Sequence, residues 1–306
     1  MKLQNILVLN SILLLFIVGC SNNSPEKNNI AEKSIQQSEK FNAYWYNNEA
    51  EITSYKLEQA RYGEIHPGKA TLIFVTEPFS RQKQVKADNP IKEDYSVLKL
   101  NFTKNFITGI YPYSMMTSSF TPVNYPDAHA SKTTTSSQEW CGHTYTQINN
   151  KNKKYTISVF SYFEDEGDQK FELKEAWLED EIWSKIRLNP DLLPTGKIRM
   201  IPSSFYVRLM HKELKAYQAE ITKTKIEDDL IAYKISYKEL DRELTINYKN
   251  SFPYPIESWE ETYISGWGDK AQKLTTKATK LKRIKLDYWT KNKVENSELR
   301  KQLELN

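Results

Sequence analysis

The sequence predicts a mainly β fold of the β-rich α+β class: a large curved antiparallel sheet or open barrel, with one packed amphipathic helix and a short C-terminal helix. Runs of alternating apolar and polar residues, rich in β-branched and aromatic side chains, follow one another from Ala50 to Leu286. Turn residues separate these runs at short intervals, which favours antiparallel neighbours. Only Leu173–Arg187 places its apolar residues at helical spacing.

The first half of the predicted sheet opens with a hairpin. Strands over 51–63 and 69–79 flank Pro67-Gly68, a pair that suits the centre of a type II turn. Further strands are expected at Val97–Phe102, Ile107–Phe120, Thr133–Ile148 and Tyr155–Phe163. The polar run Asn149–Lys154 predicts a second hairpin turn between the last two strands.

The helix Leu173–Arg187 carries Trp177 and Trp183 on its apolar side, and Asn189-Pro190 ends it. We expect it to lie in the concave side of the sheet, with its tryptophans against the strands. The strands then resume at Ile198–Met210, Leu214–Thr222, Leu230–Tyr237, Leu244–Tyr248, Pro255–Tyr263 and Lys273–Leu286, and a short helix starts at Ser297.

The expected domain organisation is a signal peptide over 1–19, a flexible tether over 20–40 and a single β-rich globular domain over 41–306. Leu100–Met116 and Ile246–Glu261 are loosely alike, so two similar halves are an alternative. A net charge of +4 spread over 306 residues gives no field suited to nucleic acid. No phosphate-binding loop, dinucleotide fingerprint or serine elbow occurs, and we predict no cofactor.

The N-terminus has the features of a bacterial lipoprotein signal. Lys2 precedes the apolar run Ile6–Gly19, which is short for a membrane span and ends at Cys20. Ile17–Cys20 resembles the lipobox of bacterial lipoproteins, whose cysteine sulfur receives a diacylglyceryl group and whose new amino group is also acylated, for example with palmitate. The resemblance implies that Cys20 is lipidated and anchors the chain to a membrane. An ordinary signal peptide with a chance cysteine is the alternative.

The residues after Cys20 indicate how the folded domain is attached and at which membrane it lies. They are almost free of apolar side chains up to residue 40, which predicts a flexible tether. Ser21 and Asn22 follow the cysteine, and no acidic run does. By resemblance to known sorting signals, this favours the periplasmic face of the outer membrane over the inner membrane.

Segments 43–79, 108–120, 136–149 and 251–263 resemble an uncharacterised group of flavobacterial lipoproteins. Members often carry the name septum formation inhibitor Maf. Maf proteins themselves are nucleotide pyrophosphatases with a layered α/β fold and an early Ser-Pro-Arg-Arg-like segment. Here Ser24-Pro25 is followed by Glu26, and strands do not alternate with helices. The resemblance therefore implies a lipoprotein, and the name adds no mechanism.

The candidate chemistry lies in the segment 136–149. On a single strand Glu139, Cys141 and His143 would share one face, as a carboxylate, a thiol and an imidazole. A cysteine hydrolase needs such groups. Neighbours two apart on a strand are, however, about 6.5 to 7 Å apart at the backbone and project in parallel, a poor geometry for a thiol–imidazole hydrogen bond.

Other readings of Cys141 are a metal site and a structural thiol. A zinc site needs three or four ligands, and the spacing brings no further histidine to Cys141, so no metal is predicted. If the sulfur of Cys20 is lipidated, Cys141 is a lone thiol. We therefore expect Cys141 to be a buried structural cysteine.

These observations favour a non-enzymatic, membrane-anchored lipoprotein that binds an apolar or amphipathic ligand, or an envelope protein, in a curved β scaffold. In architecture it resembles the periplasmic lipoprotein carriers, whose open half-barrels hold acyl chains. One alternative is an envelope hydrolase that uses Cys141 and His143. The other is a structural envelope-assembly factor without a ligand.

Overall fold

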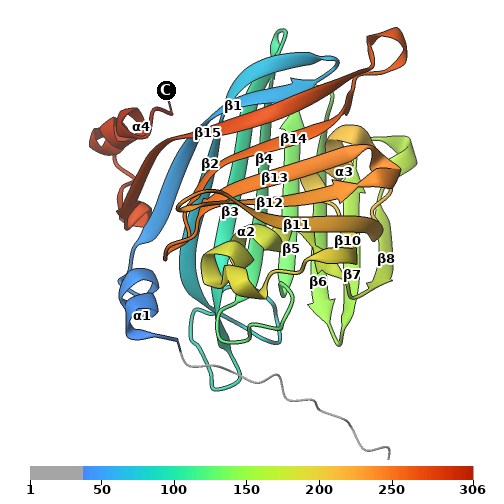
Figure 1. The fold of residues 1–306 in the computed structure, drawn as a ribbon. Helices are drawn as coiled ribbons and strands as arrows, with labels where there is room; N and C mark the ends of the chain where they lie inside the picture. The colour runs from blue at the N-terminus through green and yellow to red at the C-terminus, as the bar shows by residue number, and fades with distance from the viewer. Residues whose placement is uncertain (1–36, 306) are drawn as a thin grey trace, which may run out of the picture. The chain divides into compact units, whose positions relative to one another are not determined.

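The computed structural model of the chain describes residues 37–305, all of which fall within one compact unit. One sheet of fifteen strands dominates this unit, in the order β8-β7-β6-β5-β4-β3-β2-β1-β15-β14-β13-β12-β11-β10-β9 (Figure 1). The sheet is not closed. The predicted class, a β-rich curved sheet with one packed helix and a short C-terminal helix, is confirmed.

The strands of the first half are β1 (Ala50–Arg61), β2 (Glu64–Phe79), β3 (Tyr95–Thr108), β4 (Tyr111–Pro122), β5 (Lys132–Glu139), β6 (Gly142–Lys151), β7 (Lys154–Ser161) and β8 (Gln169–Lys174). Those of the second half are β9 (Trp177–Leu178), β10 (Gly196–Ile201), β11 (Tyr217–Glu227), β12 (Leu230–Tyr237), β13 (Arg242–Lys249), β14 (Ile256–Ser265) and β15 (Gln272–Leu286). The α-helices are α1 (Glu39–Trp45), α2 (Glu179–Leu188), α3 (Ser204–Met210) and α4 (Glu298–Gln302).

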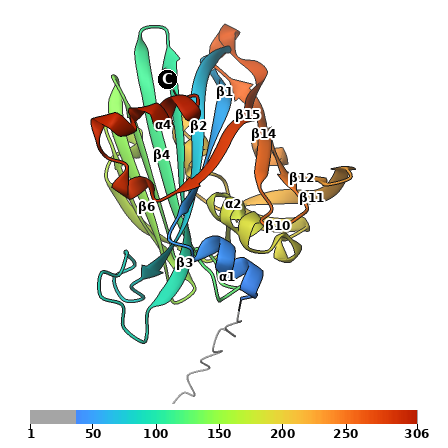
Figure 2. The same ribbon diagram turned by 90° about the vertical axis from the view of Figure 1, so that its left-hand side faces the viewer.

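The order of the strands explains the curvature of the sheet. Strands β1 to β8 form an antiparallel meander, and β15 returns to pair with the free side of β1. Strands β8 and β9 are therefore the two edges, although only Glu175 and Ala176 separate them in the chain. A link of two residues forces the two edges towards each other, so the sheet must curl round. Figure 2 shows the two halves of this curved sheet from the side.

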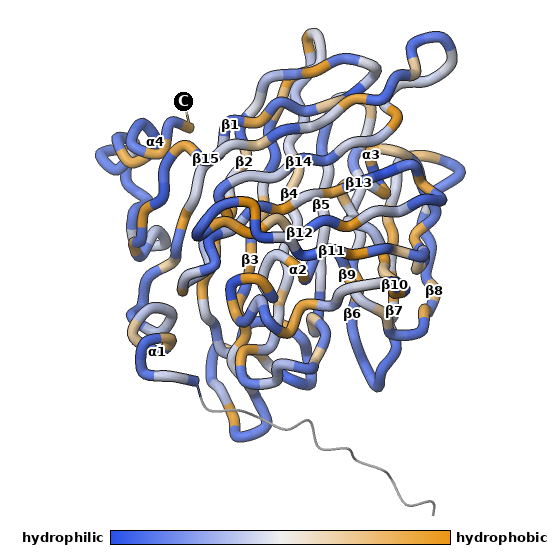
Figure 3. Tube along the Cα trace, viewed as in Figure 1, coloured by the Kyte–Doolittle hydropathy of each residue, from blue (hydrophilic) through white to orange (hydrophobic). Residues whose placement is uncertain are grey.

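Helix α2 fills the concave side of the sheet (Figures 1 and 2). The ring of Trp183 meets Phe102 of β3 at 5.0 Å and Trp259 of β14 at 5.3 Å, edge to face. The expected packing of this tryptophan against the sheet is thus confirmed. All residues from Glu179 to Arg187 are buried. Along the surrounding strands hydrophobic and hydrophilic residues alternate, as Figure 3 shows.

The predicted start of the helix at Leu173 is wrong. Residues up to Lys174 pair with β7 as strand β8, and Trp177 pairs with Met200 of β10. These backbone pairings at the two sheet edges compete with helical hydrogen bonds, so α2 begins only at Glu179. It ends at Leu188, with Asn189 as its C-cap, where the sequence predicts its end.

The predicted turn at Pro67-Gly68 is also wrong. The chain turns at Tyr62-Gly63, whose φ angles of 55° and 79° fit a two-residue hairpin turn of type I′. Pro67 and Gly68 continue β2, and Gly68 lies opposite Phe106 of β3. A Cβ atom at position 68 would lie 2.4 Å from the carbonyl oxygen of Asn105. Gly68 therefore permits a close approach of two strands, and it makes no turn.

Three predicted strands are interrupted. Thr133–Ile148 contains a turn at Trp140-Cys141, and Ile107–Phe120 contains one at Gly109-Ile110. In the range Ile198–Met210 only β10 is extended, because Pro202 follows it and Ser203 then caps helix α3. The remaining strands lie close to their predicted positions, and β12 has the predicted bounds.

The predicted signal peptide, Cys20 and most of the predicted tether lie outside the described residues. The predicted end of the tether at residue 40 is wrong, because residues 39–40 belong to helix α1, which begins at Glu39 with Ser38 as its N-cap. None of the helices within residues 37–305 has the length and apolar character that a membrane span requires.

Candidate functional site

Cys141 lies at the tip of the hairpin between β5 and β6. Glu139 and Gly142 are paired across this hairpin, so Trp140 and Cys141 form a two-residue turn. Cys141 is exposed. The prediction of a buried cysteine is therefore wrong, because the turn places the residue beyond the end of the sheet.

The structure does not bring the three candidate residues together. Gln138 pairs with His143 one position further along the hairpin, so His143 and Glu139 point to opposite faces of the sheet. His143 is exposed, whereas Glu139 is buried. The expectation that Glu139, Cys141 and His143 share a face is wrong, because a tight turn reverses the chain between them.

Glu139 disfavours the thiolate form of Cys141, which is the form that a nucleophile needs. Its carboxylate accepts a hydrogen bond of 2.6 Å from the backbone N–H of Cys141. Its hydrogen bond to the thiol and its negative charge raise the pKa of Cys141. A catalytic cysteine needs a stabilised thiolate. This geometry therefore does not support the hydrolase alternative.

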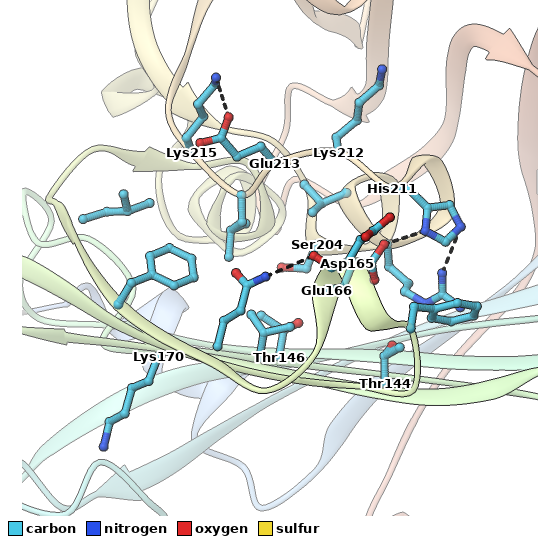
Figure 4. A pocket seen from close by; sticks show the side chains of 18 of the residues that line it. Thr144, Thr146, Asp165, Glu166, Lys170, Ser204, His211, Lys212, Glu213 and Lys215 are labelled. Carbon is cyan, nitrogen blue, oxygen red and sulfur yellow. Dashed lines mark hydrogen bonds and ion pairs between the residues drawn. The ribbon is translucent and has the colours of Figure 1, made fainter.

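A cavity of about 1030 Å³ lies beside this hairpin, between strands β6 to β8 and helix α3 (Figure 4). Its polar side chains pair with one another. His211 hydrogen-bonds Glu166, and the guanidinium of Arg208 lies 3.5 Å from Glu139 and stacks on Phe163 at 4.4 Å. Burial alone would raise the pKa of Glu166, but its bond to His211 lowers it. The cluster links strand β5 and the β7–β8 connection to helix α3.

Metal binding has no support in this region. Across residues 37–305, no three histidine, cysteine, aspartate or glutamate side chains are grouped so that they could hold an ion.

Around helix α2 the concave side of the sheet is filled by charged side chains of the helix, each of which has a partner. The pairs are Glu179 with Arg242, Asp180 with Ser204, Glu181 with His129, Lys185 with the carbonyl groups of Pro126 and Ala128, and Arg187 with Glu51. Buried charges are tolerated only when they are paired in this way. A ligand at this part of the concave face would have to displace the helix. The cavity beside α3 is separate from α2, and Val159, Phe171 and Leu173 of the same face line it.

An apolar groove lies on the outer face of the sheet. It has a volume of about 820 Å³ and runs between strands β1 to β4 and the segment after β15, which includes α4. Aliphatic side chains from both sides line it: Ile52, Ile73, Ile284, Leu286, Leu299 and Leu303. Leu303 is buried against the sheet. Cations also line the groove, namely Lys69, Lys291 and Arg300.

The groove could be predicted only in part from the sequence. Tyr55 and Leu57 face the core, so Ile52 lies on the outer face of β1, opposite Ile284 of β15. Apolar residues at outward positions of two strands are the available signal. The groove itself forms only because the C-terminal segment crosses these strands, which no local pattern predicts.

The fold therefore defines a β-rich protein with an open, curved antiparallel sheet, a charged helix in its concavity and an apolar groove on its outer face. No protein-family model matches the sequence, and no curated protein matches it. One similar solved structure is that of a porin-like protein from Bacteroides uniformis ATCC 8492, at 10% identity and a TM-score of 0.23 over 76% of this chain and 95% of that chain. A likeness of this size supports no statement about function.

Proposed function

We propose that the chain is a lipoprotein of the bacterial cell envelope, anchored through Cys20, whose β-rich domain holds an amphipathic ligand in the outer groove. The groove itself carries this proposal. Its volume of about 820 Å³ falls within the range of small-molecule sites. Its aliphatic walls suit an acyl chain, and the lysine and arginine side chains that line it suit an anionic head group.

Magnitudes favour an acyl chain over a purely polar ligand. Each methylene that leaves water contributes about 0.8 kcal/mol. An exposed ion pair contributes about 0 to 1 kcal/mol. Most of the affinity would therefore come from the chain, while Lys69, Lys291 and Arg300 would select the charge of the head group.

The groove can be tested with a fluorescent fatty acid as the probe. The Ile284→Glu variant places a carboxylate in the apolar wall, and we expect it to weaken probe binding at least tenfold, or about 1.4 kcal/mol. Val294→Glu is the control, because Val294 is 92% exposed and does not line the groove. Titration of both purified variants by fluorescence gives the comparison.

The same titration distinguishes the ligand proposal from its alternatives. Equal affinities for Ile284→Glu and wild type would place the probe elsewhere and contradict the groove. No binding to the wild type would remove the ligand altogether. A partner-binding or structural role in envelope assembly would then be the better explanation.

The lipid anchor has its own support and its own test. The support is the lipobox resemblance at Ile17–Cys20, and Ser21-Asn22 favour the periplasmic face of the outer membrane. We expect radiolabelled palmitate to enter the wild-type chain in cells and to be absent from the Cys20→Ala variant. Cys141→Ala is the matched control and should label as the wild type does. Equal labelling of Cys20→Ala would refute the anchor.

A further inference from the structure

Turns at one end of the sheet carry large apolar side chains exposed to solvent. Ile110 of the β3–β4 turn is 82% exposed, and Trp140 of the β5–β6 turn is 69% exposed. Tyr162 follows β7 and is 73% exposed, and Trp267 of the β14–β15 turn is 52% exposed. Because the first half of the sheet is an antiparallel meander, these turns all lie at the end where β1 turns into β2, as Figures 1 and 2 show.

These residues form one continuous surface, which we call the aromatic rim and define as Tyr62, Ile110, Tyr111, Trp140, Tyr162 and Trp267. The rings of Tyr62 and Trp267 are 5.6 Å apart, and those of Tyr111 and Trp140 are 6.3 Å apart. The hydroxyl groups of Tyr62 and Tyr111 are hydrogen-bonded at 3.1 Å. A Cβ atom on Gly142, beside the Trp140 turn, would lie 2.9 Å from the ring of Tyr162. The rim therefore crosses from β14–β15 to the end of β7.

The composition of these turns is unusual for surface loops. Exposed turns generally consist of Gly, Asn, Asp, Ser and Pro. The turns Tyr62-Gly63, Gly109-Ile110 and Trp140-Cys141 contain no charged residue. At the opposite end of the same strands, the β6–β7 turn is Asn152-Lys153. The β2–β3 connection, residues 80–94, is rich in charged residues there as well. These three uncharged turns thus lie at one end. The two other connections there are charged, with Glu164, Asp165, Glu166 and Asp168 after Tyr162, and Asp269 and Lys270 after Trp267.

A buried arginine supports the rim from below. Arg61 is 3% exposed, and its guanidinium lies 4.2 Å from the ring centre of Tyr62 and 5.3 Å from that of Trp267. It also donates a hydrogen bond to the carbonyl oxygen of Leu209 in α3. Tyr62 and Tyr111 therefore pack partly against the core and hold the rim in place, while Trp140, Tyr162 and Trp267 stay exposed.

We propose that the aromatic rim inserts into the interfacial region of a lipid bilayer and forms a second membrane contact of this protein. Tryptophan and tyrosine are enriched at this depth because they combine an apolar ring with a polar group. The rim residues come from five different connections between strands, so several of them can enter the head-group region at once. Exposed apolar surface of this kind marks a contact with a membrane or a protein, and tryptophan and tyrosine side chains fit the membrane interface.

The length of the chain before the described residues allows this contact in an anchored protein, a step that rests on the proposed lipid on Cys20. Gln37 hydrogen-bonds the carbonyl group of Val123, at the end of the sheet away from the rim. The 17 residue-to-residue steps from Cys20 to Gln37 can span at most about 60 Å. A strand of 14 residues, such as β3, is about 46 Å long. The rim can therefore reach the bilayer that holds the anchor.

Quenching of tryptophan fluorescence by brominated lipids tests the proposal. Residues 1–36 contain no tryptophan, so any quenching comes from the folded part of the chain. The full chain is reconstituted in vesicles of phosphatidylcholine and phosphatidylethanolamine that carry bromine on their acyl chains near the head group. We expect strong quenching for the wild type and a loss of at least half of it for the double variant Trp140→Phe/Trp267→Phe.

Control variants make the result specific. Trp289 is 42% exposed but lies after β15, outside the rim, so Trp289→Phe should keep the quenching of the wild type. Ile110→Ser/Tyr162→Ser keeps every tryptophan and should lower the quenching, because the rim would insert less deeply. Far-UV circular dichroism checks that each variant is folded. An unquenched wild type, or a folded Trp140→Phe/Trp267→Phe variant quenched as strongly as the wild type, would overturn the proposal.

Discussion

Replacing Arg242 with methionine should lower the free energy of unfolding by about 3–5 kcal/mol. Its guanidinium donates two hydrogen bonds of 2.6 Å to Glu179 of α2 and one of 2.9 Å to Glu261 of β14. All three residues are buried. The Arg242→Met variant keeps the volume of the side chain but leaves two carboxylates without their main cation. Urea denaturation of variant and wild type measures the loss.

A surface pair supplies the control for this prediction. Lys234 and Glu243 form an ion pair of 2.8 Å, and both side chains are more than 40% exposed. Lys234→Met should therefore change the free energy of unfolding by about 0 to 1 kcal/mol. If Arg242→Met were as mild as Lys234→Met, the buried network would not stabilise α2 in the way that the structure indicates.

The stability of the protein should fall in acid, and Glu51 should account for a large share of this loss. Burial alone would raise the pKa of Glu51, but the ion pair with Arg187 and the nearby Arg283 hold it at about 2. A folded-state pKa below the usual 4.5 gives stability that is complete above pH 4.5 and is lost as the pH falls towards 2. The difference corresponds to about 3 kcal/mol.

The Glu51→Gln variant isolates this contribution. It should be less stable than the wild type at pH 7, because Arg187 is buried and loses its charged partner. Its free energy of unfolding should then fall less steeply between pH 4.5 and 2. Thermal unfolding at several pH values checks both effects. Glu243→Gln is the matched control, since Glu243 lies in an exposed pair and should leave most of the acid dependence intact. Parallel pH profiles for Glu51→Gln and the wild type would contradict the assignment.

The two proposed surfaces meet at one hairpin. Ile107 and Pro112, on β3 and β4, line the outer groove, while Ile110 and Tyr111 at the same hairpin belong to the aromatic rim. A rim in the bilayer interface would therefore place one part of the groove close to the lipid. An amphipathic ligand could pass between the bilayer and the groove without crossing bulk water. The proposed lipid anchor, rim and groove would then act together.

The sequence by itself determined the β-rich class, the approximate positions of most strands, the bounds of β12 and the end of helix α2. Each of these follows from local patterns: alternation for β12, and the Asn189-Pro190 pair for the end of the helix. The lipobox resemblance at Cys20 is equally local, and it stays a prediction. Local patterns are reliable here because the residues that decide the outcome are neighbours in the chain.

The exposure of Cys141 shows where local patterns fail. A two-residue turn shifts the alternation of side chains by one position, but Trp140-Cys141 contains none of the residues that normally mark a turn. The residues on both sides are mostly polar, so hydrophobic alternation does not reveal this shift in the sequence. Only pairing with β4 and β7 places the turn at residue 140 and puts Cys141 at the end of the sheet.

The charged helix, the groove and the rim were decided by the tertiary structure alone. The acidic and basic residues of α2 would suit a solvated helix, yet their partners, such as Glu51 and Arg242, lie far away in the chain and make burial possible. The groove needs the C-terminal segment to cross β1 to β4, and the rim needs separate turns to meet at one end of the sheet. Burial and contact depend on residues brought together from distant parts of the chain, and a local pattern contains no information about them.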